Sequence, residues 1–284
     1  DFLCNDMAIF TASLNSGSNG NCYYIGNSTE AILVDAGLSC RETEKRMKQL
    51  GLTLDKVKAI FISHEHTDHI KGVSQISAKY ALPVHISRKT LQNCPVGIKQ
   101  HLIRNITDNE SVTIGQLTVH PFNKQHDAAD PFSFRITCND ITVGVFTDIG
   151  SPCEKLIRNF SRCHAAYLET NYDEEMLEKG YYPVHLKRRI KGGNGHLSNI
   201  QALELFCKYK PGFMTHLFPS HLSKENNSPE LVSRMFKEYA GETQVVVASR
   251  FESTPVFRIV AKGMQPGMET AKHTNNSAAQ LRLF

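Results

Sequence analysis

The sequence predicts an α/β fold in which two sheets lie between two layers of helices, a four-layer αββα sandwich built as a single domain. Two observations predict it: both halves of the chain are rich in short apolar strands, and helical patterns alternate with those strands. A chain of 284 residues with 40% hydrophobic residues is long enough to bury one large core or two small ones. Because the helices flank both strand-rich halves, we expect one sandwich rather than two independent domains.

The first half begins with strands and continues with alternating strands and helices. A capping box of Ser39 and Glu42 starts a helix that stops at Gly51. Apolar residues at helical spacing predict a second helix over residues 70–80. The predicted strands of this half are Met7–Leu14, Cys22–Ile25, Ala31–Val34, Val57–Ile62 and Pro83–Ile86.

The second half repeats this organisation. One helix follows the Ser198 cap, with Gln201 at the third position, and another begins at Ser228-Pro229, a favourable cap and first residue. The predicted strands of this half are Leu117–Phe122, Phe132–Cys138, Ile141–Thr147, Ala165–Glu169, Gly212–Phe218, Gln244–Ala248 and Val256–Val260.

Composition narrows the class of protein only loosely. The formal net charge of +4 is compatible with a nucleic-acid partner but does not require one. Eight cysteines occur without a Cys-x-x-Cys pair, which indicates small hydrophobic residues in a reducing cytosol rather than disulfides or a zinc knuckle. No apolar stretch reaches the roughly 18–20 residues of a membrane span. We therefore expect a cytoplasmic protein with no membrane partner.

The most informative segment is His64-Glu65-His66-Thr67-Asp68-His69, directly after a predicted buried strand. Imidazole and carboxylate groups are the ligands that divalent transition metals favour. Alternation along the strand end directs His64 and His66 the same way, and Asp68 and His69 on the next turn can reach a second ion. Two ions about 3.5–4 Å apart are typical of phosphodiester hydrolysis. The alternative, a solvated histidine-rich loop, fits poorly with the apolar run before it.

Further short stretches carry a resemblance to a known family. They are Ser16-Gly17-Ser18-Asn19-Gly20-Asn21, Leu33-Val34-Asp35-Ala36-Gly37, His126-Asp127-Ala128-Ala129-Asp130-Pro131, Phe146-Thr147-Asp148-Ile149-Gly150, Gly195-His196-Leu197-Ser198-Asn199 and His221-Leu222-Ser223-Lys224-Glu225-Asn226-Asn227. With the histidine run, they make residues 7–262 resemble the metallo-β-lactamase fold, and within it the YycJ/WalJ group of bacterial nucleases.

This resemblance implies a set of metal ligands. His64, His66 and His126 would hold one divalent ion, and Asp68, His69 and His221 would hold the other. Asp148 would bridge the two, so that Asp68 and Asp148 also belong to the catalytic set. Mixed histidine and carboxylate sites accept Zn or Mn, and both remain open. Asp35 is expected behind the ligands, hydrogen-bonding a metal-bound histidine or a loop.

His196 and a basic run precede one of the predicted helices. His196 stands two residues before the Ser198 cap, where a helix N-terminus favours phosphate, and in related tRNA 3′-processing nucleases a similar histidine is not a ligand. We expect His196 to stabilise the transition state or act as a general acid. Lys187, Arg188 and Lys191 share a helix face that could contact successive phosphates. The alternative for these cations is a solvated helix face.

The predicted function is that of a dinuclear phosphodiesterase. The resemblance implies a 5′→3′ DNA exonuclease acting in replication-linked repair. An RNA-processing nuclease of the same fold is the first alternative, and an ester or lactone hydrolase is a weaker one, because Asp-Ala-Ala-Asp-Pro follows His126. A metal-free DNA-binding or adaptor protein is disfavoured, because none of the ligand positions is missing.

The two ends of the chain are expected to lie outside the catalytic domain. Residues 1–6 precede the first strand and form a non-native or disordered lead. Residues 263–284 are rich in Gly, Asn, Ser and Ala, and form a flexible tail. The tail ends in Gln280, Leu281, Arg282, Leu283 and Phe284, which resembles the peptide by which bacterial replication and repair proteins bind the DNA sliding clamp. Leu281, Leu283 and Phe284 are apolar side chains suited to a groove on that partner.

Overall fold

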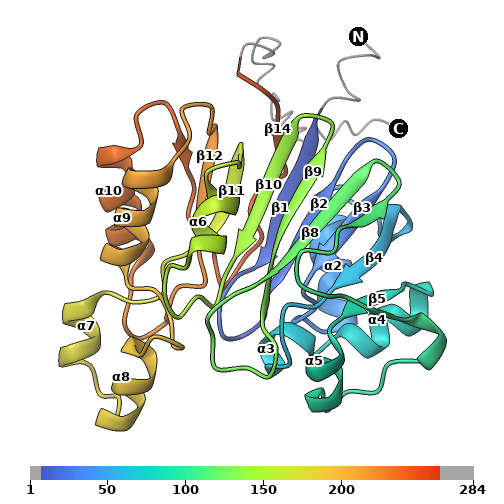
Figure 1. Ribbon diagram of the computed structural model, residues 1–284, viewed down its shortest axis with the longest axis horizontal. Helices are drawn as coiled ribbons and strands as arrows, with labels where there is room; N and C mark the ends of the chain where they lie inside the picture. Colours follow the sequence, from blue (N-terminus) through green and yellow to red (C-terminus); the bar gives the residue numbers. More distant parts are fainter. Residues whose placement is uncertain (1–7, 263–284) are drawn as a thin grey trace, which may run out of the picture.

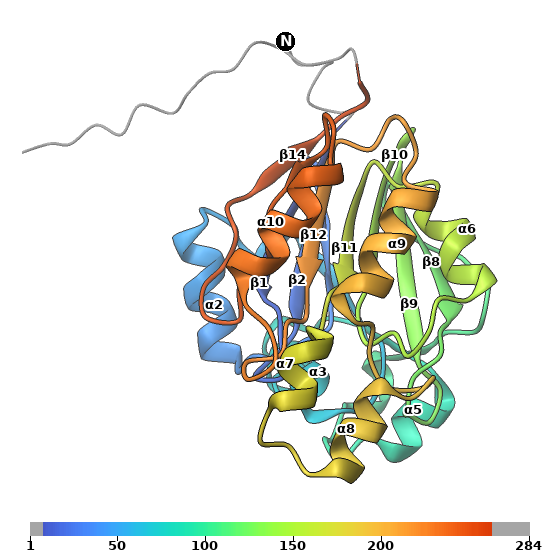
Figure 2. The ribbon, with the colours of Figure 1, turned by 90° about the vertical axis from the view of Figure 1, so that its left-hand side faces the viewer.

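The computed structural model describes residues 8–262, and within this range two seven-stranded sheets pack face to face between helices (Figures 1 and 2). The predicted αββα sandwich is confirmed. The clamp-like peptide at residues 280–284, with the rest of residues 263–284 and residues 1–7, lies outside the described part of the chain.

The first sheet comes mostly from the N-terminal half. Its strands are antiparallel from β14 to β3, and parallel from β3 to β6. In spatial order they are β14 (Phe257–Ile259), β1 (Ile9–Asn15), β2 (Cys22–Gly26), β3 (Ala31–Val34), β4 (Val57–Phe61), β5 (Val84–Ile86) and β6 (Ile103–Asn105).

The second sheet mirrors this mixed arrangement. β7 to β10 are antiparallel, while β10 to β13 run parallel. In spatial order the strands are β13 (Gln244–Val245), β12 (His216–Ser220), β11 (Ala165–Glu169), β10 (Ile141–Phe146), β9 (Phe132–Cys138), β8 (Leu117–Asn123) and β7 (Val112–Ile114).

Helices cover the outer faces of both sheets (Figure 1). The first sheet is covered by α2 (Cys40–Gln49) and α4 (Val73–Tyr80), with α5 (Arg88–Asn93) near the lower end of the sandwich, and the second by α6 (Glu154–Phe160), α9 (Asn199–Tyr209) and α10 (Pro229–Tyr239). Three others, α3 (Thr67–Ile70), α7 (Glu174–Lys179) and α8 (Val184–Lys191), gather at one end of the sandwich (Figures 1 and 2). Two 3-10 turns, Leu54–Lys56 and Gln100–Leu102, complete the elements of residues 8–262.

The core between the sheets is built from large apolar side chains. Phe61 and Phe134 pack edge to face with ring centroids 5.8 Å apart, and Tyr23 lies 4.8 Å from Tyr167. Burying one such ring stabilises the fold by about 1.5–3 kcal/mol. The Tyr167 hydroxyl is paired across the core with Thr11 Oγ1 at 3.0 Å, so the buried polar group is satisfied.

Several boundaries differ from the sequence-based expectation. Ser39 caps α2 by accepting from the Glu42 backbone N–H, but the Glu42 carboxylate pairs with Arg46 instead of completing a capping box. The helix expected over residues 70–80 is split into α3 and α4. At the break, a Cβ on Gly72 would lie 1.9 Å from the Leu38 carbonyl oxygen, so only glycine permits this approach.

Other differences concern short elements. β12 begins at His216 rather than at Gly212, because a turn in which Met214 N–H donates to Pro211 precedes it. β13 keeps only Gln244 and Val245 of the predicted strand. Within residues 8–262, no helix is both long enough and apolar enough to cross a membrane.

Candidate metal centre

The histidine run follows the C-terminal end of β4. The C-terminal ends of β3, β10, β11 and β12 lie at the same edge of the sandwich. His66 is the N-cap of α3, so Asp68 and His69 occupy the first turn of that helix. The backbone of the turn is fixed, because the Asp68 carbonyl accepts from Asn21 N–H at 2.7 Å and the His69 carbonyl accepts from Ala36 N–H at 2.8 Å.

Three residues at these strand ends have left-handed backbone conformations. Their φ angles are 61° for Asp35, 55° for Asp148 and 57° for His221. Such conformations cost residues other than glycine on the order of 1–3 kcal/mol and are concentrated at functional sites. Each follows a buried parallel strand, and the turn redirects its side chain toward the shared edge.

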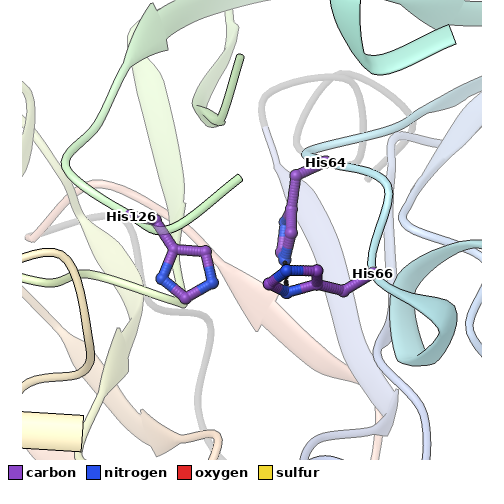
Figure 3. Close-up of side chains that lie close together, drawn as sticks. All are labelled: His64, His66 and His126. Atoms are coloured by element: carbon purple, nitrogen blue, oxygen red, sulfur yellow. Dashed lines mark hydrogen bonds between the residues drawn. The ribbon is translucent and has the colours of Figure 1, made fainter. Parts of the chain in front are cut away.

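His64, His66 and His126 form what we call the three-histidine pocket, shown in Figure 3. His64 Nε2 and His66 Nδ1 lie 3.0 Å apart. The His126 ring reaches them from the loop between β8 and β9, with its centroid 4.9 Å from that of His64 and 5.2 Å from that of His66. One nitrogen from each ring lies within 4.8 Å of the others, close enough to share one ion.

Asp68, His69 and His221 form a second group with the same spacing, which we call the mixed pocket. Asp148 faces both groups. Its Oδ2 lies 3.2 Å from His69 Nε2, and its Oδ1 lies 3.6 Å from His221 Nδ1 and 3.8 Å from His126 Nε2. Asp148 therefore lies between the two pockets, and its carboxylate is within reach of both.

The pockets differ in electrostatics. In the three-histidine pocket, burial holds the pKa of His64 well below its usual range and lowers that of His126 to about 4. In the mixed pocket, burial also disfavours charge, but the carboxylates outweigh it. Asp148 and its acidic neighbours raise the pKa of His69 well above its usual range and that of His221 to about 10.

Both pockets fit divalent cations. Among the described residues, His126 Nε2, His221 Nε2 and Asp148 Oδ2 are buried without a hydrogen-bond partner. Each unsatisfied buried group costs about 1–3 kcal/mol, so a bound cation that accepts these three atoms would stabilise the cluster. Imidazole nitrogen and carboxylate oxygen are the donors that Zn and Mn accept.

Asp35 lies behind the mixed pocket, in the position expected for a residue that orients a ligand. Its Oδ2 is 2.7 Å from His69 Nδ1, and its Oδ1 accepts from the Ser63 backbone N–H at 2.8 Å. This contact leaves His69 Nε2 facing Asp68 and Asp148. A partner on the far ring nitrogen fixes the tautomer and orientation of a ligating histidine.

The loop of residues 16–21 supports the same pocket. Ser16 Oγ accepts from the His221 backbone N–H at 2.8 Å. Asn21 Nδ2 donates to Asp68 Oδ2 at 3.1 Å. The loop thus holds two members of the mixed pocket, His221 and Asp68, in place.

Glu169 is a central residue of the site that the sequence analysis missed. It is fully buried at the end of β11, and its Oε1 lies 2.8 Å from His196 Nδ1 and 2.9 Å from His221 Nδ1. Burial alone would raise its pKa, but His196 and His221 lower it to about 2. The available signal was an acidic residue closing the apolar strand Ala165–Glu169, beside the strand that ends before His221.

His196 stands at the open side of the cluster. Its side chain is 22% exposed, and its ring lies 5.2 Å from that of His126 and 5.4 Å from that of His221. It precedes α9, whose N-terminus carries the full capping box of Ser198 and Gln201. Because Glu169 accepts from Nδ1, Nε2 of His196 is left for another partner.

Lys124 was also missed. Its ammonium group is buried two residues before His126 and donates to the Thr147 carbonyl at 2.6 Å. Burial lowers its pKa, while the charge of Asp148 opposes that effect. We infer that this cation offsets part of the negative charge gathered at the strand ends.

The basic run forms the helix α8. Its cations were expected to be free for phosphates, but several of them contact groups of the protein itself. Lys187 donates to the Glu178 carbonyl at 2.5 Å, and Lys191 lies 2.6 Å from Glu178 Oε2, so α7 supplies the acid that the run itself lacks. Arg188 is exposed. Arg189, not singled out from the sequence, pairs with Asp127 at 2.5 Å. It lines a cavity of about 190 Å³ that opens onto His196 and His221.

Comparisons with known proteins agree with this geometry. A family model described as "Beta-lactamase superfamily domain" matches residues 30–221. Exodeoxyribonuclease YycJ of Bacillus anthracis is 35% identical over 254 residues, covering 87% of this chain and 94% of the relative. Exodeoxyribonuclease WalJ of Streptococcus pneumoniae serotype 2 is 32% identical over 223 residues, covering 77% of this chain and 83% of the relative.

A solved structure shows the same fold. The metallo-beta-lactamase fold protein YhfI from Bacillus subtilis has a TM-score of 0.68 at 17% identity, covering 89% of this chain and 99% of that one.

Proposed function

This chain belongs to the beta-lactamase superfamily as a metal-dependent hydrolase related to the YycJ and WalJ exodeoxyribonucleases, and from that premise we propose a 5′→3′ DNA exonuclease with two metal ions. His64, His66 and His126 would hold one ion, and Asp68, His69 and His221 the other. Asp148 would bridge them. Zn and Mn both suit this donor set.

The observation that carries the proposal is the position of Asp148 between the two pockets. Its two oxygens lie 3.2–3.8 Å from nitrogens of His69, His221 and His126, which come from both groups. A carboxylate placed in this way can hold two cations at the short separation that phosphodiester hydrolysis uses. A single structural ion would not require seven converging side chains.

The residues of the chain divide the chemical work. Two divalent cations held by these residues would supply Lewis acidity and make a water-derived nucleophile available at neutral pH. Asp68 and Asp148 provide the negative charge that holds them. Glu169 holds His196 through Nδ1, so His196 Nε2 can donate a proton to the departing oxygen or stabilise charge on the phosphate. The nearby N-terminus of α9 favours an anion at the same place.

The DNA substrate and the polarity rest on resemblance. Two relatives that this chain matches over most of their length carry the name exodeoxyribonuclease, which supports DNA and attack from an end. The 5′→3′ direction and a role in replication-linked repair in the cytoplasm belong to the same proposal. So does docking of Gln280, Leu281, Leu283 and Phe284 onto the sliding clamp, with residues 263–279 as the tether.

End-labelled DNA and RNA oligonucleotides, incubated with protein loaded with Zn or Mn, test the proposal. We expect shortening of DNA from its 5′ end, with RNA cut more slowly. Asp148→Ala protein is the matched control. Preferential cleavage of RNA would make the RNA-processing alternative correct, and no cleavage of either polymer would contradict the nuclease assignment.

A truncation tests the tail separately. Removing residues 280–284 should abolish co-elution with the clamp while nuclease activity on short oligonucleotides is unchanged. Equal clamp binding by the truncated protein would contradict the docking proposal.

A further inference from the structure

One cavity opens directly onto the candidate metal centre. It encloses about 190 Å³, and His196 and His221 form part of its lining. The segment between α7 and α8 provides Tyr182, and α8 provides Leu186 and Ile190. A concave, partly apolar site with a few polar groups, next to a reactive centre, is the usual form of a substrate pocket.

Its walls are suited to a flat, partly polar ring. Tyr182 offers an aromatic face, with Leu186, Ile190 and Leu222 as the apolar surround. Asn171 and Ser223 add donors and acceptors. Aromatic residues beside a cationic groove are the standard means of holding single-stranded nucleic acid, because every base has a π face.

One arginine lines this cavity, and a second is bonded to residues of its wall. Arg189 lines it and neutralises Asp127, whose Oδ1 is 3.4 Å from His126 Nε2. Without Arg189, an incoming phosphate would meet an uncompensated carboxylate beside the three-histidine pocket. Arg250 is hydrogen-bonded to two residues that line the cavity, to Ser18 Oγ at 3.3 Å and to the Leu222 carbonyl at 3.5 Å.

We propose that this cavity binds the base of the terminal nucleotide, with Tyr182 stacking on it and Arg189 and Arg250 facing the flanking phosphates. The proposal rests on the nuclease function proposed above. It also supplies a physical reason for end-directed cleavage, since the cavity has room for a single base beside His196. Tyr182 is a specificity-determining residue in this account and acts on the bound nucleotide, while the metal ligands act on the phosphate.

The test measures whether Tyr182 and the terminal base depend on each other. Single-stranded oligonucleotides that end either in a normal nucleotide or in an abasic residue are digested by metal-loaded protein. Wild-type protein should prefer the normal end by about 5- to 160-fold in kcat/KM, the range that one base–aromatic stack provides. Tyr182→Ala should bring that ratio close to one, and Tyr182→Phe, which keeps the ring, should preserve it.

Tyr181→Ala is the matched control, because Tyr181 is the adjacent tyrosine, is fully exposed at 105%, and does not line the cavity. Its ratio should equal that of wild type. Circular dichroism and metal content show whether each variant is folded and loaded.

The outcomes separate the two proposals. Wild-type protein that cuts no DNA would contradict the nuclease function, and this inference with it. DNA cleavage in which Tyr182→Ala keeps the wild-type ratio, or in which Tyr181→Ala loses the ratio equally, would overturn the base pocket alone.

Discussion

The three-histidine pocket and the mixed pocket lie side by side but are built in different ways. Two members of the first, His64 and His66, lie two residues apart after the end of one strand, and burial lowers the pKa of His64 and of His126. The second also draws on the first turn of α3, but it depends on Asp148, Glu169 and His221 from three parallel strands. Its histidines are held protonated by carboxylates.

Because of this difference, the two pockets impose different requirements on metal binding. Metal ligands must be deprotonated, so an ion entering the mixed pocket has to displace protons from His69 and His221. In the three-histidine pocket, His64 and His126 need no such release near neutral pH, because burial lowers their pKa values. We therefore expect the mixed pocket to lose its ion first as the pH falls.

The largest expected effect comes from removing the Asp148 carboxylate, which lies between the two pockets. Asp148→Ala should lose both ions, since its carboxylate contacts both pockets, and activity should fall to background. His66→Ala should lose the ion of one pocket only, with activity also abolished. Metal content per chain, measured after gel filtration, distinguishes the variants. Two ions retained in Asp148→Ala would show that the pockets do not depend on a common residue.

The next effect separates chemistry from metal binding. His196→Ala should keep both ions and lower kcat by about 10²–10⁴-fold, as expected for loss of a proton donor. His196 is held by Glu169 and is partly exposed, whereas five of the seven proposed ligands are buried: His64, His69, His126, Asp148 and His221. Depleted metal in this variant would make His196 a ligand and contradict its assignment.

A smaller effect concerns the pH dependence of stability without metal. The pKa of His221 is about 10 in the folded chain and about 6.5 in the unfolded one, so its stabilisation is complete below pH 6.5 and is lost as the pH rises toward 10. The free energy of unfolding should fall by up to about 1.4 kcal/mol per pH unit in this window. For a chain of this size, that decrease corresponds to a fall in Tm of about 2–4 °C per pH unit.

Calorimetry of metal-free protein between pH 6.5 and 9 measures this slope. Protein with metal bound should lack it, because its ligating histidines are already neutral. A Tm of the metal-free protein that rises with pH would contradict the protonation states assigned to the mixed pocket.

The smallest effect lies on the surface outside both pockets. Arg188→Ala should weaken DNA binding a few-fold and reduce the salt slope by about one. Lys187→Ala and Lys191→Ala should act less, because Glu178 already engages both side chains. Anisotropy titrations at several salt concentrations give the slope. An unchanged slope in Arg188→Ala would make α8 an ordinary solvated helix face.

The same contrast explains how much the sequence could predict. The histidine run is local, and a strand period of two places His64 and His66 together, so its pocket could be anticipated from spacing. Strands β10 and β11 could be predicted because their apolar runs are nearly continuous, and β8 and β9 because apolar and polar residues alternate along them. Asp148 and His221 were named only through resemblance, since their approach depends on which strands are neighbours in a sheet.

Glu169, Lys124 and Arg189 could not be found in this way. A single acid or base at the end of a strand or in a helix is common, and the role of these residues becomes visible only from their tertiary contacts. β6, β7 and α5 to α7 were overlooked because each has at most seven residues, too few to show a periodic pattern. Ser39 and Glu42 matched a capping box in sequence, yet Arg46 competed successfully for the carboxylate.

The central claim is that two unlike pockets share Asp148. Anomalous scattering from Zn²⁺-loaded crystals of the wild-type protein, held at about pH 8 and then at about pH 5, tests it most directly. We predict two peaks on either side of Asp148 at the higher pH, and at the lower pH one peak among His64, His66 and His126. A single peak at both pH values, or an ion retained only at His69 and His221 in acid, would contradict the account.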